Sequence, residues 1–221
     1  MFVGHLAVAL AARRASPRTP LAALVAAAFG LDLIWPIFLL AGLERVRVAP
    51  GITASTPLDF EHYPWSHSLS MAIIWGVAAG RLFVFRSKHV GTAAVIGLVV
   101  VSHWVLDYVT HRPDLPLWPG GPLVGLGLWN SIPATFVVEG ALFAAAIAAY
   151  LRGTRARTRA GDWAFWSLVA FTTLIWASGP FSPPPPSATA IATVGLAMLL
   201  FPLWAHWIDR TRVDANAKRS R

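Results

Sequence analysis

The sequence contains no cysteine, and only 13% of its 221 residues are charged. The absence of cysteine excludes disulfides and thiolate ligands, so any metal ion must be held by nitrogen and oxygen atoms. The scarcity of charge excludes an ordinary soluble domain, because 56% of the residues are hydrophobic and a domain of this length cannot bury them all. We therefore expect an integral membrane protein.

Acidic residues are especially scarce, with 10 aspartates and glutamates against 18 lysines and arginines, and the net charge is +8. A basic excess can indicate nucleic-acid binding, but here the cations lie in short runs between apolar segments. Such runs are typical of the cytoplasmic loops of membrane proteins. Membrane lipids, and no nucleic acid, are the expected partners.

Apolar segments long enough to cross a bilayer, which takes about 20 residues, predict an all-α polytopic transmembrane helical bundle. The predicted full spans are residues 20–42, 66–85, 90–108, 133–151, 162–180 and 188–208. A shorter apolar stretch, residues 1–12, lacks the leading positive charge of a secretory signal and is expected to stay in the protein as a half-crossing helix. The whole chain, residues 1–221, is expected to form one integral-membrane domain, with its polar site within residues 1–140.

The basic residues fall in every second loop, which predicts the orientation of the bundle. They are Arg13, Arg14 and Arg18, then Arg86 and Lys88, then Arg152, Arg155, Arg157 and Arg159, and finally Arg210, Arg212, Lys218, Arg219 and Arg221. The positive-inside rule places these loops, among them residues 152–161 and the tail 209–221, in the cytoplasm. The other connections, residues 44–65, 109–132 and 179–187, then face outward.

Several ionisable residues lie in or at the ends of the apolar segments, where they are costly unless they have a function. They are Asp32, His67, His103, Asp107 and Glu139. A rise of about 1.5 Å per residue places them at a similar depth near the outer membrane face. His5 joins them if the short first helix descends from that face. Histidine with carboxylate is a ligand set for divalent ions, which predicts a buried metal site, most simply for Zn²⁺.

The strongest local pattern is the row of His103, Asp107 and His111, spaced four residues apart. On a helix this spacing places the side chains on one face, so His103 and Asp107 can bind one ion and His111 continues the row. The alternative is a hydrogen-bonded histidine and carboxylate pair that only stabilises the helices. For Asp32 and Glu139, the alternative is an acid that joins two helices through a hydrogen bond.

In order and spacing, these residues resemble the bacterial inner-membrane-associated metal-dependent hydrolases, which include the LexA-binding inner-membrane type. The likeness runs as far as Glu139 and rests on Gly4-His5, Asp32, His67-Ser68, the His103 and Asp107 pair, and the proline-rich stretch that ends at Pro119. The chain has Asp32-Leu33 where this family commonly has an aspartate pair, and Glu61-His62-Tyr63 where a His-Arg pair is common.

More distantly, the order of these residues is similar to that of zinc-dependent phospholipase C. This resemblance implies a site for one to three zinc ions. The ligands that it implies are His5, Asp32, His67, His103, Asp107, His111 and Glu139.

Together these features predict a membrane-embedded metal-dependent hydrolase of a phospholipid or lipid-linked phosphate ester. A metal-activated water would attack, Asp32 or Glu139 would accept its proton, and Arg112 would neutralise the phosphate. Arg112 is equally compatible with an interfacial ion pair to Asp114. The alternatives from other classes are a metal-ion or proton transporter or channel, and a structural membrane protein with a non-catalytic metal site. A transporter needs polar groups through both leaflets, and the ligand-like residues stop at mid-membrane.

Overall fold

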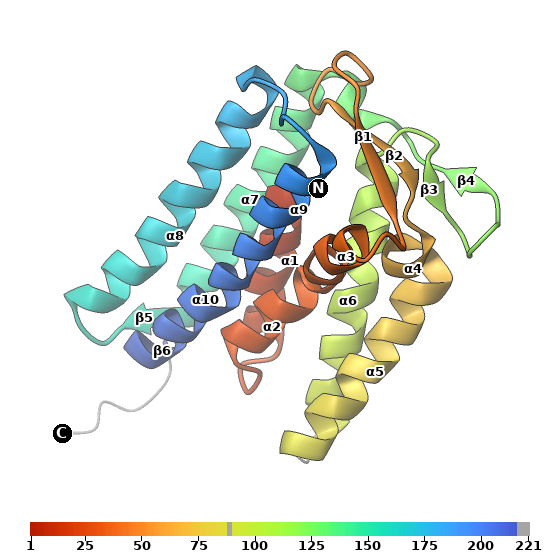
Figure 1. Cartoon of the computed structure of the whole chain (residues 1–221). Helices are drawn as coiled ribbons and strands as arrows, with labels where there is room; N and C mark the ends of the chain where they lie inside the picture. The colour runs from red at the N-terminus through yellow and green to blue at the C-terminus, as the bar shows by residue number, and fades with distance from the viewer. Residues whose placement is uncertain (88–89, 216–221) are drawn as a thin grey trace.

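The computed structural model describes residues 1–87 and 90–215. Lys88 and the tail residues Lys218, Arg219 and Arg221, on which part of the predicted orientation rests, lie outside the described residues. The fold is an all-α polytopic helical bundle (Figure 1). Its longer helices are α1 (Phe2–Ala15), α2 (Leu21–Ala28), α3 (Gly30–Leu40), α5 (Leu69–Ser87), α6 (Val90–Thr110), α7 (Ile132–Gly153), α8 (Arg159–Ser178), α9 (Ala188–Leu196) and α10 (Leu200–Thr211).

The predicted spans correspond to helices in the structure. Five helical segments in the described part of the chain are long and apolar enough to cross a membrane: Leu69–Arg86, Val90–Thr110, Ile132–Gly153, Arg159–Phe181 and Ala188–Thr211. The pair α2 and α3 adds a sixth if it forms one span, but it is bent by 50°. The segment predicted as a span at residues 20–42 is therefore two helices, broken where Phe29 leaves the helix ahead of Gly30, a residue of low helix propensity.

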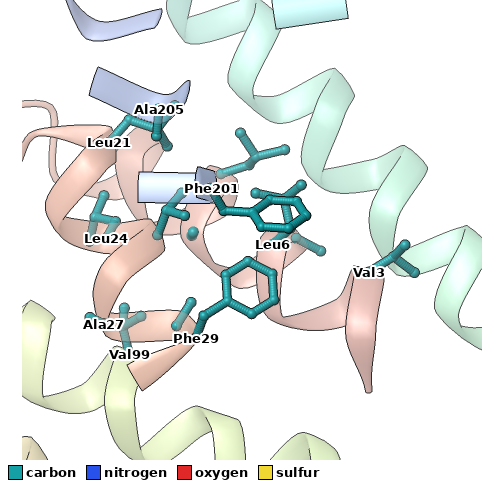
Figure 2. Packing of buried hydrophobic residues seen from close by; sticks show 14 of the residues in the cluster. Val3, Leu6, Leu21, Leu24, Ala27, Phe29, Val99, Phe201 and Ala205 are labelled. Carbon is teal, nitrogen blue, oxygen red and sulfur yellow. The ribbon is translucent and has the colours of Figure 1, made fainter. Parts of the chain in front are cut away.

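Helix α1 lies at the centre of the bundle, in contact with α2, α6 and α7. Its side chains Val3 and Leu6 are fully buried, as are Leu21 and Leu24 of α2. Figure 2 shows these residues in one cluster with Phe29 and Phe201, whose ring centroids lie 5.2 Å apart. The short apolar stretch at the start of the sequence thus forms part of the core that supports the other helices.

Helices α5 and α6 form a closely packed pair (Figure 1). A Cβ atom built on Gly76 of α5 would lie 2.8 Å from the backbone oxygen of Gly97 on α6, and one built on Gly80 would lie 3.0 Å from the backbone oxygen of Ala93. Small residues let helix backbones approach closely in a membrane, where packing replaces the hydrophobic effect as the main attraction between helices. The pair fixes the position of α6, which carries His103 and Asp107.

Short strand pairs close both ends of the bundle. The sequence predicts loops in these segments. At one end β1 (Arg45–Val48) pairs with β2 (Leu58–His62), and β3 (Leu115–Pro116) pairs with β4 (Leu123–Val124). The four-residue helix α4 (Pro64–His67) follows β2. We call this the hairpin end; β5 (Thr154–Ala156) and β6 (Arg212–Asp214) pair at the opposite end (Figure 1).

Charged side chains also hold the opposite end together, among them the buried Arg212. The guanidinium of Arg212 lies 5.2 Å from the ring centroid of Phe165 and donates a hydrogen bond to Asp162 at 3.1 Å. Asp209 accepts hydrogen bonds from the backbone nitrogens of Leu21 and Ala22, both at 2.9 Å, and so caps α2. These contacts join α2, α8 and α10 at this end of the bundle.

Candidate metal centre

Five of the predicted site residues meet near the hairpin end of the bundle. They are His5 of α1, Asp32 of α3, His67 of α4, and His103 and Asp107 of α6. Two groups each bring three ligand atoms within 4.8 Å of one another, namely His5, His103 and Asp107, and Asp32, His67 and His103. His5, His67, His103 and Asp107 are all buried.

The carboxylate of Asp107 faces the imidazoles with both oxygens. Its Oδ1 lies 3.2 Å from Nε2 of His5, and its Oδ2 lies 3.1 Å from Nε2 of His103 and 4.0 Å from Nε2 of His67. The second carboxylate, Asp32, lies on the other side, with Oδ1 3.5 Å from Nε2 of His67 and 3.7 Å from Nε2 of His103. Imidazole nitrogens and carboxylate oxygens therefore surround one small volume.

His103 is fixed by the break between α2 and α3. The carbonyls of the last turn of a helix have no partner within that helix. The carbonyl of Ala28, the last residue of α2, lies 2.7 Å from Nδ1 of His103. Because a carbonyl only accepts, Nδ1 carries a proton, and Nε2 is the nitrogen that faces the carboxylates.

His67 is fixed by a chain of two hydrogen bonds. The hydroxyl of Ser66 lies 2.7 Å from Glu44 Oε2 and 2.7 Å from Nδ1 of His67. Since the ionised carboxylate of Glu44 accepts the hydroxyl proton, the hydroxyl oxygen accepts from Nδ1, and Nε2 of His67 is the free nitrogen. Glu44 also accepts the backbone N–H groups of Trp65 and Ser66. Such supporting bonds are typical of histidine ligands in metal sites.

The hydrogen-bonding state of these atoms fits a divalent cation. No group within residues 1–87 and 90–215 forms a hydrogen bond to Nε2 of His103, although the atom is buried and Asp107 lies close to it. Buried nitrogens without a partner are rare in proteins, and a bound ion accounts for one whose lone pair faces carboxylates. The ammonium of Met1 donates to Asp107 Oδ1 at 2.6 Å and lies 3.2 Å from His5 Nε2, so the site already accommodates a positive charge.

The ligand groups border a cavity of about 150 Å³. His5, Asp32, His67 and Asp107 line it on one side, and His111 lines it together with aromatic and apolar side chains. The cavity is large enough for a few water molecules beside an ion.

His111 lies outside both ligand groups, although the sequence predicted it as a ligand. Helix α6 ends at Thr110, so the row of His103 and Asp107 does not continue to it. Its Nδ1 lies 2.9 Å from Asp114 Oδ1 and 3.2 Å from the hydroxyl of Tyr63, which donates to the same carboxylate oxygen at 3.1 Å. Burial, with Asp114 beside it, raises the pKa of the Tyr63 phenol well above its usual value, so the hydroxyl keeps its proton.

Glu139 of α7 also lies outside both ligand groups. Its Oε1 accepts a hydrogen bond from the indole of Trp129 at 3.4 Å, and its buried Oε2 has no hydrogen-bond partner in the described part of the chain. Glu139 is thus not a member of the groups that contain His103 and Asp107, although it interacts electrostatically with Asp107 and with the Met1 ammonium.

Arg112 is held by carboxylates at the hairpin end. It donates to Asp114 Oδ2 at 3.1 Å and forms an ion pair with Asp59, which also pairs with Arg47. The cavity lining does not include Arg112. The ion pair with Asp114, one of the two roles compatible with the sequence, is thus present.

The sequence reading did not identify Glu44 or Asp114 as parts of the site. Glu44 orients His67 through Ser66, which follows Glu44 by 22 residues, so only the folded chain brings them together. For Asp114 a signal was available, because it follows His111 at the three-residue spacing that lets a turn bring the two side chains together.

Comparison with known proteins supplies a family for the chain. No curated protein and no solved structure matches it. The sequence profile of the YdjM inner membrane protein family matches residues 1–181, which contain α1 to α8 and all five residues of the two ligand groups. The chain belongs to the YdjM inner membrane protein family.

Proposed function

We propose that the protein is a membrane-embedded, metal-dependent hydrolase that cleaves a phosphate ester of a phospholipid or lipid-linked molecule. The observation that carries this proposal is the meeting of three imidazoles and two carboxylates from four separate helices around one buried volume. A membrane protein retains such costly groups for a function, and this donor set suits zinc.

His5, His67, His103, Asp32 and Asp107 are the residues that would hold the ion or ions. The two oxygens of Asp107 face different histidines, so this carboxylate would contribute to holding the ion or ions with His5 and with His103. Nε2 of His103 belongs to both ligand groups, but its single lone pair can serve one ion only. When bound, a divalent ion makes a water molecule acidic enough to act as a nucleophile at neutral pH.

His111 is well placed to move the proton of that water. Asp114 engages Nδ1 of its ring, which leaves Nε2 as the nitrogen available for proton transfer at the cavity. A carboxylate that orients a histidine in this way is typical of general acid–base sites. Asp32, whose side chain is 24% exposed, is the second candidate for this role. Glu139, the other base that the sequence suggested, does not line the cavity.

The proposed orientation places the hairpin end at the periplasmic face and the chain's C-terminal region in the cytoplasm. The runs that include Arg152, Arg155 and Arg157 follow α7 at the end opposite the hairpins, as the positive-inside rule requires. The metal centre then lies within the outer leaflet, near the depth of lipid phosphates. A substrate that is itself part of the membrane can reach a site at this depth.

A structural role is the second candidate, and the ion pair between the Met1 ammonium and Asp107 favours it. In that case the polar cluster would only hold α1 against α6. The two candidates differ in whether the protein binds a stoichiometric metal ion.

Elemental analysis of the detergent-purified protein tests the proposal, with His103→Ala and Asp107→Ala as variants and His206→Ala, an exposed residue of α10, as control. We expect zinc in the wild type and the control and none in the site variants. Hydrolysis of phosphatidic acid and of a prenyl diphosphate in proteoliposomes should follow zinc content. A wild-type protein without stoichiometric metal, or a His103→Ala variant with full turnover, would show that the hydrolase proposal is wrong.

A further inference from the structure

A second, larger space adjoins the metal centre. It is a groove of about 550 Å³ between α8 and the α9–α10 segment, within the range of small-molecule sites. Phe171 and Ile175 of α8 form one wall, and Ala190 and Val194 of α9 form part of the other. Every side chain that lines it in the described structure is apolar or aromatic, and none is ionisable.

The groove borders the cavity at the metal centre. Phe2, Trp35, Gly195 and Met198 line both spaces. A Cβ atom on Gly195 would lie 2.6 Å from Cγ of Pro36, so the glycine allows α9 to pack directly on α3 beside the junction. A lipid that occupied both spaces would have its polar end at the carboxylates of the centre and one hydrocarbon chain in the apolar groove.

The groove also lies within the membrane-crossing part of the chain. Its walls belong to Arg159–Phe181 and Ala188–Thr211, two of the segments that can span a bilayer. Val194 and Leu200, which line it, are 71% and 60% exposed on a surface that faces lipid. A molecule in the bilayer can thus enter it sideways.

We propose that this groove binds one hydrocarbon chain of the lipid whose phosphate ester is cleaved at the metal centre, an inference that rests on the proposed function. Water would find almost no hydrogen-bond partners along this lining, and a peptide would bring backbone groups that the lining cannot satisfy. A flexible hydrocarbon chain carries no such groups. With the phosphate at the ligands and the chain in the groove, the ester bond lies at the junction near Met198.

A second groove, apolar except for Arg86, provides a control. It has a volume of about 650 Å³, lies between α2, α5 and α6, and is lined by residues such as Ala78 and Leu82. It shares no lining residue with the metal-centre cavity. Ordinary boundary lipid should occupy both grooves alike, whereas a substrate chain should prefer the groove that leads to the centre.

The test uses the full chain in phosphatidylcholine vesicles with zinc. The probe is phosphatidic acid with a diazirine at the end of one acyl chain, and its adducts are mapped by mass spectrometry. We expect adducts on α8, α9 and α10. Unlabelled phosphatidic acid should lower their yield more than unlabelled diacylglycerol does. Ala190→Trp should lower the yield of these adducts about tenfold, because removing as few as two methylenes from an apolar site has an effect of this size. Ala78→Trp should leave the yield unchanged.

The inference is wrong if both grooves are labelled equally and neither a competitor nor Ala190→Trp changes the labelling. The bound hydrocarbon chain would then be boundary lipid. Zinc content and hydrolysis of a short-chain phosphatidic acid are measured on the same samples. Ala190→Trp should keep both while it loses hydrolysis of the long-chain lipid. If the wild type neither binds zinc nor hydrolyses either lipid, yet competed adducts in the groove persist, the proposed function fails and the chain site stands.

Discussion

The imidazole ring of His5 lies parallel to that of His103, with ring centroids 3.6 Å apart and an angle of 4° between the planes. The two rings come from α1 and α6, and both direct Nε2 toward Asp107. Stacking and ligation are separable here, because an aromatic ring without nitrogen keeps the first and loses the second.

We therefore predict that His5→Phe keeps the fold and loses metal affinity. The phenyl ring can remain stacked on His103, so the thermal unfolding temperature in detergent should change little. Zinc affinity should fall by more than about 100-fold, because losing a ligand exceeds the effect of losing a supporting partner. Competition with a zinc chelator measures the affinity. Unchanged affinity in this variant would show that His5 serves packing only.

Ser66→Ala should weaken zinc binding without removing any ligand. The change breaks the link between Glu44 and His67, so the ring of His67 is free to turn and to change tautomer. We expect zinc affinity to fall about 10- to 100-fold, as is usual for partners of metal-bound histidines. Glu61→Gln is the control, because Glu61 lies on the preceding strand β2 and pairs only with Arg47 among the described residues. Equal effects of the two variants would contradict the prediction.

The variant His111→Ala should show whether His111 is a metal ligand or a proton-transfer residue. Since His111 lies outside both ligand groups, the variant should keep its zinc. Turnover should fall about 10²- to 10⁴-fold, the usual contribution of a general acid or base. Asp114→Asn, which alters the hydrogen bond to Nδ1, should show a smaller loss of the same kind. Loss of zinc from His111→Ala would instead support the ligand role that the sequence suggested.

Arg112→Met should act mainly on stability. The change leaves the buried carboxylates of Asp59 and Asp114 with fewer donors, which we expect to cost about 1–3 kcal/mol of unfolding free energy. Denaturant titration of the hairpin end, followed by the fluorescence of a nearby tryptophan, measures this cost. A loss of turnover far beyond what reduced stability explains would indicate that Arg112 leaves its carboxylates to contact substrate.

Gly76→Ala should destabilise the pair α5 and α6. The added Cβ would lie 2.8 Å from the Gly97 oxygen, so the helices must move apart. We expect a loss of about 1–3 kcal/mol, as for other overpacked contacts. Gly91→Ala is the matched control on α6, because a Cβ there meets no atom within 4 Å. Similar unfolding temperatures for the two variants would show that close backbone packing is unimportant.

The spans could be predicted from the sequence because a membrane restricts the chain to few conformations. Lipid satisfies no backbone hydrogen bonds, so a long apolar segment must be a helix, and its length gives its bounds. The break at Phe29 was not predictable in this way. Gly30 lowers the helix propensity there, but the packing of Phe29 against Phe2 and Phe201 exists only in the assembled bundle.

The site was predictable where local geometry suffices. The four-residue spacing brings His103 and Asp107 to one helix face, and the depth count brings Asp32 and His67 near them. His111 follows the last residue of α6 and lies outside both ligand groups, and Asp114, which binds its Nδ1, lies beyond the helix, where the four-residue spacing gives no guidance. Whether the clustered residues bind a metal stays a prediction.

The break between α2 and α3 links the shape of a membrane span to the chemistry beside it. The Ala28 carbonyl holds His103 only while α2 ends there, so straightening the pair would return that carbonyl to its own helix. The two effects are thermodynamically linked. An ion bound at His103 would stabilise the bent form by the same free energy by which straightening would weaken ion binding. The thickness of the surrounding bilayer determines how far a bent span must stretch. Bilayer thickness would thereby change the affinity for the ion.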